Sequence, residues 1–156
     1  MAGTCCFTGH RSIPRAIEMA VKDKTMEVIT ELYLRGVRTF KAGGALGYDT
    51  IAALCVLELR EKYPDVRLEL ELICEEQADG WEPGERGMYA AILNKCDVSR
   101  YASAHYSTPA IFARNRNLVN GSDVCVCYLT KTSGGTAYTA NYAKKCGLKV
   151  INIANI

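Results

Sequence analysis

Short apolar runs alternate with longer amphipathic runs along the whole chain. The apolar runs are rich in β-branched and aromatic residues and in cysteine, and a length of about five residues is typical of strands. They predict strands at 3–7, 37–41, 67–73, 98–101, 123–128 and 149–153. In the third of these, leucines at 68, 70 and 72 alternate with glutamates at 69 and 71. One face of that strand should therefore meet water, which favours an edge position in the sheet.

The amphipathic runs predict five helices between the strands. Their expected spans are 20–35, 48–62, 83–95, a fourth from about 108 to 120, and 136–145. Gly36 should end the first as a left-handed cap, and Ile51, Leu54 and Cys55 should face inward from the second. The fourth should have Thr108 as its N-cap and Pro109 at its first helical position.

Strands and helices that alternate in this way are typical of a parallel α/β sheet. We therefore predict a Rossmann-like three-layer sandwich with a mainly parallel sheet of about six strands, formed by one domain that spans 1–156. No apolar run approaches the roughly 18 residues that a membrane span needs. The first residues lack the basic and long apolar segments of a secretory signal, so we expect a cytoplasmic protein with no membrane partner.

Charge and cysteine content exclude some classes of function. The formal net charge is +2 and the basic residues are scattered, so electrostatics alone gives no reason to expect nucleic acid as a partner. The chain has eight cysteines but no CxxC pair, and only two histidines. Cys125 and Cys127 should share one face of a strand, but we read these thiols as small buried apolar groups and expect no metal site.

The most informative stretch is the glycine turn between the second strand and the second helix. Gly43, Gly44 and Gly47 can bring bare backbone N–H groups to a helix N-terminus, where the partial positive charge favours a phosphate or carboxylate. Asp49 falls in the first turn of that helix, and two roles for it stay open. It can cap the helix, or it can accept hydrogen bonds from a ribose hydroxyl.

A second glycine turn follows the fifth strand and precedes the fifth helix. Ser133 or Thr136 can cap that helix, but the double glycine Gly134 and Gly135 is more than a cap requires. In open parallel sheets the ligand lies at the carboxyl ends of the strands. That rule brings together the loops at 8–11, 43–49 and 131–136, and so predicts a cleft for a phosphorylated ligand between two glycine turns.

Other polar residues are candidates for the same cleft. After the first strand, Gly9 permits a tight turn, and its neighbours Thr8, His10 and Arg11 offer donors to an anion. In the fourth helix, Ile111, Phe112, Leu118 and Val119 should form the buried stripe, with Asn115 near it and Arg114 to one side. The alternative is a solvated basic face in which Asn115 is a structural residue. Trp81 can stack on a base or cover the core.

Four segments together resemble the YpsA-like branch of the SLOG superfamily, which joins the DNA-processing protein Smf/DprA to the LOG-type phosphoribohydrolases. The segments are Cys6-Phe7-Thr8-Gly9-His10-Arg11, Gly43 to Ala53, Arg114-Asn115-Arg116-Asn117, and Ser133 to Thr139. The resemblance covers nearly the whole chain. It implies a Rossmann-like fold and a site for a nucleotide or a nucleotide-derived ligand such as ADP-ribose or NAD fragments.

The resemblance also leaves the activity open. LOG enzymes hydrolyse nucleoside 5′-monophosphates and carry an Arg-Lys pair followed by PGGxGTxxE. Here Arg114 stands at the arginine, Asn115 replaces the lysine, and Asn141 stands at the glutamate. An amide cannot accept a proton as a carboxylate does. We therefore expect a nucleotide-binding protein or sensor, for which no cofactor beyond the nucleotide-type ligand is implied.

Two alternatives stay beside that expectation. The first is an N-glycosidic hydrolase in which Asp49 and Arg114 are catalytic, and the second is a single-stranded DNA-binding protein. By analogy with related folds, a homodimer is also open.

Overall fold

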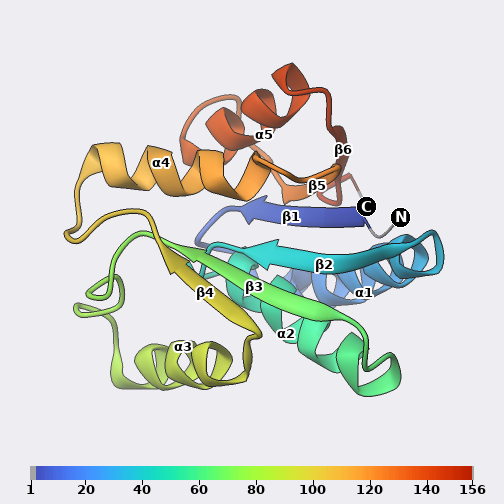
Figure 1. Ribbon diagram of the computed structural model, residues 1–156, viewed down its shortest axis with the longest axis horizontal. Coiled ribbons are helices and arrows are strands. Elements are labelled where there is room, and N and C mark those ends of the chain that lie inside the picture. Colours follow the sequence, from blue (N-terminus) through green and yellow to red (C-terminus); the bar gives the residue numbers. More distant parts are fainter. Residues whose placement is uncertain (1–2, 156) are drawn as a thin grey trace.

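A single parallel sheet organises the computed structural model, which describes residues 3–155 (Figure 1). Its strands are β1 (Gly3–Gly9), β2 (Val37–Ala42), β3 (Arg67–Leu72), β4 (Val98–Tyr101), β5 (Val124–Tyr128) and β6 (Lys149–Asn152). Within the described range they form one six-stranded sheet in the order β4-β3-β2-β1-β5-β6. Each strand pair is parallel. The predicted α/β fold class is therefore confirmed. Met1 and Ala2, the first residues of the segment assessed for a secretory signal, lie outside the described residues.

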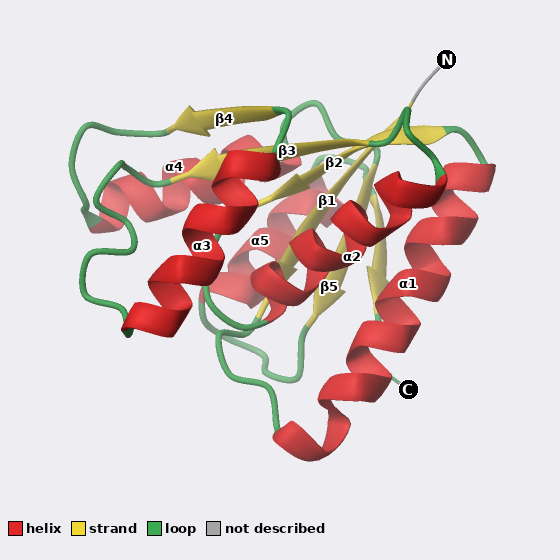
Figure 2. Cartoon of the chain, turned by 90° about the horizontal axis from the view of Figure 1, so that it is seen from below, coloured by secondary structure: helices red, strands yellow, loops and turns green. Residues whose placement is uncertain are grey.

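Helices cover both faces of the sheet and make the three layers. They are α1 (Glu18–Leu34), preceded by the 3₁₀ turn η1 (Arg15–Ile17), then α2 (Tyr48–Lys62), α3 (Pro83–Lys95), α4 (Thr108–Val119) and α5 (Gly135–Lys145). Figure 2 shows α1, α2 and α3 on one face, with α4 and α5 behind the sheet on the other. Among the described residues, no helix is both long and apolar enough to cross a bilayer.

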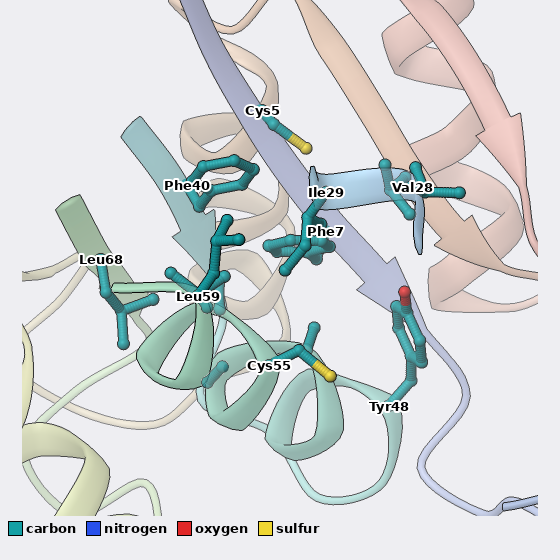
Figure 3. Close-up of a cluster of buried hydrophobic side chains, with 14 of the residues drawn as sticks. Cys5, Phe7, Val28, Ile29, Phe40, Tyr48, Cys55, Leu59 and Leu68 are labelled. Atoms are coloured by element: carbon teal, nitrogen blue, oxygen red, sulfur yellow. The ribbon is translucent and has the colours of Figure 1, made fainter. Parts of the chain in front are cut away.

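The alternation of side chains along the strands places apolar residues on both faces of the sheet. The larger cluster lies under α1 and α2 and contains Cys5, Phe7 and Phe40 (Figure 3). On the opposite face Cys6 packs with Cys125 and Cys127, which do share a face, and with apolar residues of α4 and α5. These cysteines are buried and unbonded. In residues 3–155 no group of three or more His, Cys, Asp or Glu side chains could hold a metal.

The position predicted for β3 is wrong. It lies inside the sheet, between β2 and the edge strand β4. Its acidic face is not simply solvated, because Glu71 is buried and pairs with Arg100 at 2.7 Å and with Lys41 at 3.9 Å. The alternation correctly showed a polar face, but ion pairs rather than water satisfy it.

Two local predictions also need correction. Ser107 rather than Thr108 is the N-cap of α4, and its Oγ accepts a hydrogen bond from the backbone N–H of Ala110 at 3.1 Å. In α2, Leu54 is exposed. The buried stripe of α2 includes Cys55, as predicted, together with Ala52, Ala53, Val56 and Leu59.

A candidate ligand cleft at the carboxyl ends of the strands

A cleft of about 820 Å³ opens where β1, β2 and β5 end, within the size range of small-molecule sites. It lies where the loop rule for parallel sheets predicts a ligand. Most of the predicted site residues line it, namely Thr8, Gly9, His10, Arg11, Asp49, Arg114, Asn115, Ser133, Gly134, Gly135 and Thr136. Gly43, Gly44 and Gly47 are the predicted residues that are not part of the lining.

The glycine turn after β2 packs directly against the loop after β1. Gly47 has a φ of 79°, and a methyl group there would overlap the backbone carbonyl of Arg11. The N–H of Tyr48, at the start of α2, already donates to the carbonyl of His10 at 3.1 Å. The close packing accounts for Gly47 without a ligand, so phosphate binding by this turn stays a prediction.

Gly43 separates two charged side chains at the floor of the cleft. Its carbonyl accepts hydrogen bonds from Nη1 of Arg114 at 2.6 Å and from Nε2 of Gln77 at 3.1 Å. A methyl group on Gly43 would lie 2.8 Å from Oδ2 of Asp49 and 2.9 Å from Nη1 of Arg114. Only a residue without a side chain lets the carboxylate and the guanidinium converge here.

Asp49 is the acidic residue of the cleft and is only 4% exposed. Its Oδ2 accepts a hydrogen bond from the N–H of Ala45 at 3.2 Å. Its Oδ1 is buried and has no hydrogen-bond partner among the described residues. Burial raises the pKa of Asp49 to about 6, although the charge of Arg114 and the bond from Ala45 act in the opposite direction. A carboxyl group of this kind can exchange a proton near neutral pH.

Arg114 and Asn115 are buried, contrary to the expectation that Arg114 lies beside the apolar stripe of α4. Nε of Arg114 donates to Oδ1 of Asn115 at 2.9 Å. Burial lowers the pKa of Arg114, and the nearby carboxylate of Asp49 opposes that shift. Ile111 and Phe112, predicted to be buried, are only half-buried. The inward face of α4 is therefore polar at this point, because it forms a wall of the cleft.

The second glycine turn leaves the N-terminus of α5 open. The N-cap is Gly134, with a φ of 98° and no side chain to bond the helix. Neither Ser133 nor Thr136 is therefore the N-cap. The first four N–H groups of an α-helix have no partner within the helix. In α5 the first residues that carry such groups, Gly135 and Thr136, line the cleft. This is the geometry that attracts an anion.

His10 joins the loops after β1 and β5. Its Nε2 accepts a hydrogen bond from the N–H of Thr130 at 2.9 Å, so the neutral ring carries its proton on Nδ1. Burial, with a contribution from Lys131, lowers the pKa of His10. The neutral imidazole links the two loops through this hydrogen bond. That His10 donates a hydrogen bond to an anion stays a prediction.

Sequence reasoning missed several residues of the lining. Lys131 lies in a loop that the strand-end rule selected, but it was not singled out. Tyr106 and Gln77 also line the cleft, in segments that follow β4 and β3, and no pattern in the sequence marks them. Trp81 lines the cleft too, and packs edge to face on Tyr89 with ring centroids 5.4 Å apart.

Comparison with known proteins supports the architecture and identifies a sequence family. The YpsA family model, described as the YspA SLOG family, matches residues 5–153. The SPbeta prophage-derived protein YoqJ of Bacillus subtilis is 29% identical over 140 residues, which cover 81% of this chain and 82% of that protein.

Two solved structures share the fold at low identity. The DNA processing protein A (DprA) of Streptococcus pneumoniae superposes with a TM-score of 0.67 and 15% identity, over 96% of this chain and 49% of that one. This chain therefore corresponds to about half of that protein. DprA of Helicobacter pylori gives a TM-score of 0.66 and 18% identity, over 98% of this chain and 70% of its own.

Proposed function

Because the chain belongs to the YspA SLOG family, we propose that it binds a nucleotide or a nucleotide-derived ligand, such as ADP-ribose or a fragment of NAD, as a sensor or binding protein. The observation that carries this proposal is the uncapped N-terminus of α5, which opens into a cleft with an excess of positive charge. Free N–H groups and the helix dipole both favour an anionic group at that point.

The charges of the lining support an anionic ligand. Its cationic side chains are Arg11, Lys131 and Arg114, and Asp49 is its one acidic side chain among the described residues. The imidazole of His10 is neutral when it accepts from Thr130. Clefts lined mainly by one sign of charge concentrate ligands of the opposite sign.

The rest of the lining suits a planar ring. Trp81, Tyr106 and Ile111 line the same cavity. Aromatic and apolar side chains offer stacking surface to a base, while the polar groups fix the orientation of the ligand. A ligand with a phosphate and a base uses both parts of the cleft.

The test is a thermal-shift panel on the purified protein. AMP, ADP, ATP, ADP-ribose, NAD, GMP and ribose 5-phosphate are added one by one, and recovered ligand is analysed by mass spectrometry. A ligand at ~100 times its dissociation constant should stabilise the protein by about 2.7 kcal/mol. No stabilisation by any of them would contradict the proposal.

A matched pair of variants assigns a shift to the cleft. Arg11→Gln removes a cation from the lining and should weaken binding. Arg35→Gln removes a cation of equal charge from a surface pair with Glu31 and should leave binding unchanged. Equal effects of the two would mean that the ligand is attracted by net charge rather than held in the cleft.

The burial of Asp49 favours one second candidate, a nucleotide N-glycosidic hydrolase. A carboxyl group with a pKa of about 6 in a ligand cleft can act as general acid or base. Asn141, at the position of the LOG glutamate, is exposed and is not part of the lining. Asp49 is therefore the carboxylate available for such a reaction. Free base released by the wild type but not by Asp49→Asn would establish turnover, and recovery of intact ligand would leave binding alone.

Single-stranded DNA is the remaining alternative. DprA of Helicobacter pylori, which shares the fold, is described as having a single-stranded DNA binding mode. This chain has a net charge of only +2, which gives little electrostatic attraction for a polyanion. We therefore rank a nucleotide or nucleotide-derived ligand first.

A further inference from the structure

Asp49 has one oxygen, Oδ1, without a hydrogen-bond partner among the described residues, and this atom indicates which group of the ligand is recognised. Oδ1 is buried without a hydrogen-bond partner in the described part of the chain, in a residue that is only 4% exposed and lines the cleft. A buried polar atom without a partner is costly, and in native structures such an atom calls for an explanation. Capping of α2 does not supply one, because no side chain among residues 3–155 caps that helix, and Oδ2 accepts the N–H of Ala45 in the turn before it.

The neighbouring cation does not satisfy Oδ1 either. Arg114 directs Nη1 to the carbonyl of Gly43 and Nε to the amide oxygen of Asn115. Its guanidinium is thereby fixed by two neighbours other than the carboxylate. Arg114 acts on Asp49 through charge, and Oδ1 keeps its capacity to accept a hydrogen bond.

The chemistry of the cleft selects the kind of donor. A cationic donor would meet Arg114 and two further cationic side chains, Arg11 and Lys131. Like charges repel in a partly buried site, so a neutral donor is favoured. A hydroxyl group is the neutral donor that a phosphorylated ligand most commonly offers.

A short series of contacts links Asp49 to the anion-binding end of the cleft. Arg114 reaches Gly43 beside Asp49, and it also bonds Asn115. The amide nitrogen of Asn115 lies 4.0 Å from the position of a methyl group built on Gly135, in the first turn of α5. The acceptor and the open helix N-terminus are therefore two ends of one continuous wall.

We propose that Oδ1 of Asp49 accepts a hydrogen bond from a sugar hydroxyl of the ligand whose phosphate lies at the N-terminus of α5. Asp49 then determines specificity, because it favours a ribose phosphate over its deoxy counterpart. This inference rests on the proposed nucleotide-binding function and adds the part of the ligand that is recognised. A site built around a ligand hydroxyl discriminates against the analogue that lacks it, because the buried acceptor is then left unpaired.

The experiment is isothermal titration of the full chain with AMP and GMP, each compared with its 2′-deoxy and 3′-deoxy analogues. In the wild type, loss of the recognised hydroxyl should weaken binding roughly 10- to 100-fold, the range for a hydrogen bond to a charged group. Asp49→Ala should bind the ribonucleotide and its deoxy analogues with similar affinity. Asp49→Asn, which keeps the size of the side chain, should reduce the preference if the alanine variant does not fold.

Asp123→Ala is the matched control. Like Asp49, Asp123 accepts a hydrogen bond from a backbone N–H, that of Thr4 at 2.9 Å, but it lies at the opposite ends of the strands. This variant should keep the full preference of the wild type.

The outcomes separate this inference from the function on which it rests. Binding of AMP or GMP with no loss for either deoxy analogue would overturn the role of Asp49 and leave the proposed function in place. A preference that persists in Asp49→Ala would overturn it as well. If neither ribonucleotide binds, this inference fails, whereas the proposed function fails only if the other ligands of the thermal-shift panel also leave the protein unstabilised.

Discussion

Asp49 lies in an unusual environment for a carboxyl group, and that environment makes the stability of the protein depend on pH. Burial raises the pKa of its carboxyl group from 3.8 to about 6. A group whose pKa is higher in the folded state stabilises the fold fully below about pH 4, and this contribution is lost as the pH rises through about 6. At neutral pH the loss is on the order of 3 kcal/mol.

Asp49→Asn should remove this dependence without changing the size of the side chain. Near pH 4 we expect the variant and the wild type to have similar free energies of unfolding. At pH 7 the variant should be more stable by up to about 3 kcal/mol. Urea denaturation at a series of pH values measures this difference, in which the other carboxylates cancel. A difference that does not change with pH would mean that Asp49 is not a buried carboxylate in solution.

The glycine at position 47 provides a second prediction at the scale of one residue. Gly47 and Gly121 both have a φ of 79°, so an alanine at either meets backbone strain. Around Gly121 nothing lies within 4 Å of an added methyl group, whereas at Gly47 the methyl would overlap the carbonyl of Arg11. Gly47→Ala should therefore cost about 1–3 kcal/mol more than Gly121→Ala, the usual cost of overpacking.

Thermal or urea unfolding of the two variants measures that difference. Equal losses would show that backbone conformation alone requires Gly47, and that the loop after β1 does not pack on the turn after β2. The comparison thus tests the contact that forms one corner of the cleft.

At the scale of elements, Lys41 connects β2 to α4. Its Nζ donates to the carbonyls of Asn117 at 2.5 Å and Asn120 at 3.1 Å, near the C-terminus of α4, and lies 3.9 Å from Oε1 of Glu71. Burial lowers the pKa of Lys41, and the charge of Glu71 opposes the shift. Two residues later, Gly43 accepts the hydrogen bond of Arg114. The same stretch of chain therefore holds α4 at two points.

Lys41→Met keeps the apolar stem but removes the charge and both hydrogen bonds. The carbonyls of Asn117 and Asn120 lose their donor, and Glu71 keeps only its pair with Arg100, so we expect destabilisation of about 3 kcal/mol. Lys24→Met, which breaks an exposed pair with Glu27, should change stability by less than about 1 kcal/mol. If urea denaturation gives similar losses for both, Lys41 does not anchor α4.

The strands and most helix bounds could be predicted because each depends on local pattern. The order of the strands does not depend on local pattern alone. Nothing in the sequence of β3 indicates that the short strand β4 pairs with its outer side and becomes the edge of the sheet. The N-cap of α4 was misplaced by one residue because Ser107 and Thr108 are adjacent hydroxyl residues. The inward face of α4 was misjudged because a pattern of apolar residues treats Arg114 as solvated. Only the packed structure shows that the cleft buries it.

At the scale of the whole molecule, the cleft is a product of topology. Thr8 and Thr136 line one cavity because β1 and β5 are neighbours in the sheet although they are distant in sequence. The sequence could therefore place the loops at one edge through the rule for parallel sheets. The sequence could not predict that Oδ1 of Asp49 lacks a partner within the described residues, or which hydrogen bonds hold Arg114, because both depend on atomic contacts.

The distribution of charge at this scale predicts weak and non-specific contact with single-stranded DNA. The net charge is +2, and the cations of the cleft lie in one cavity of about 820 Å³ rather than along an extended groove. A 20-nucleotide oligothymidylate should therefore bind only above roughly 100 μM at physiological salt, at the weak end of non-specific affinities. Fluorescence anisotropy of the labelled oligonucleotide at low and physiological salt measures this. Binding in the low micromolar range that AMP displaces, and that Arg11→Gln weakens but Arg35→Gln does not, would instead make the cleft a site for a strand end. In that case the base and phosphate surfaces described above would serve a polymer rather than a free nucleotide.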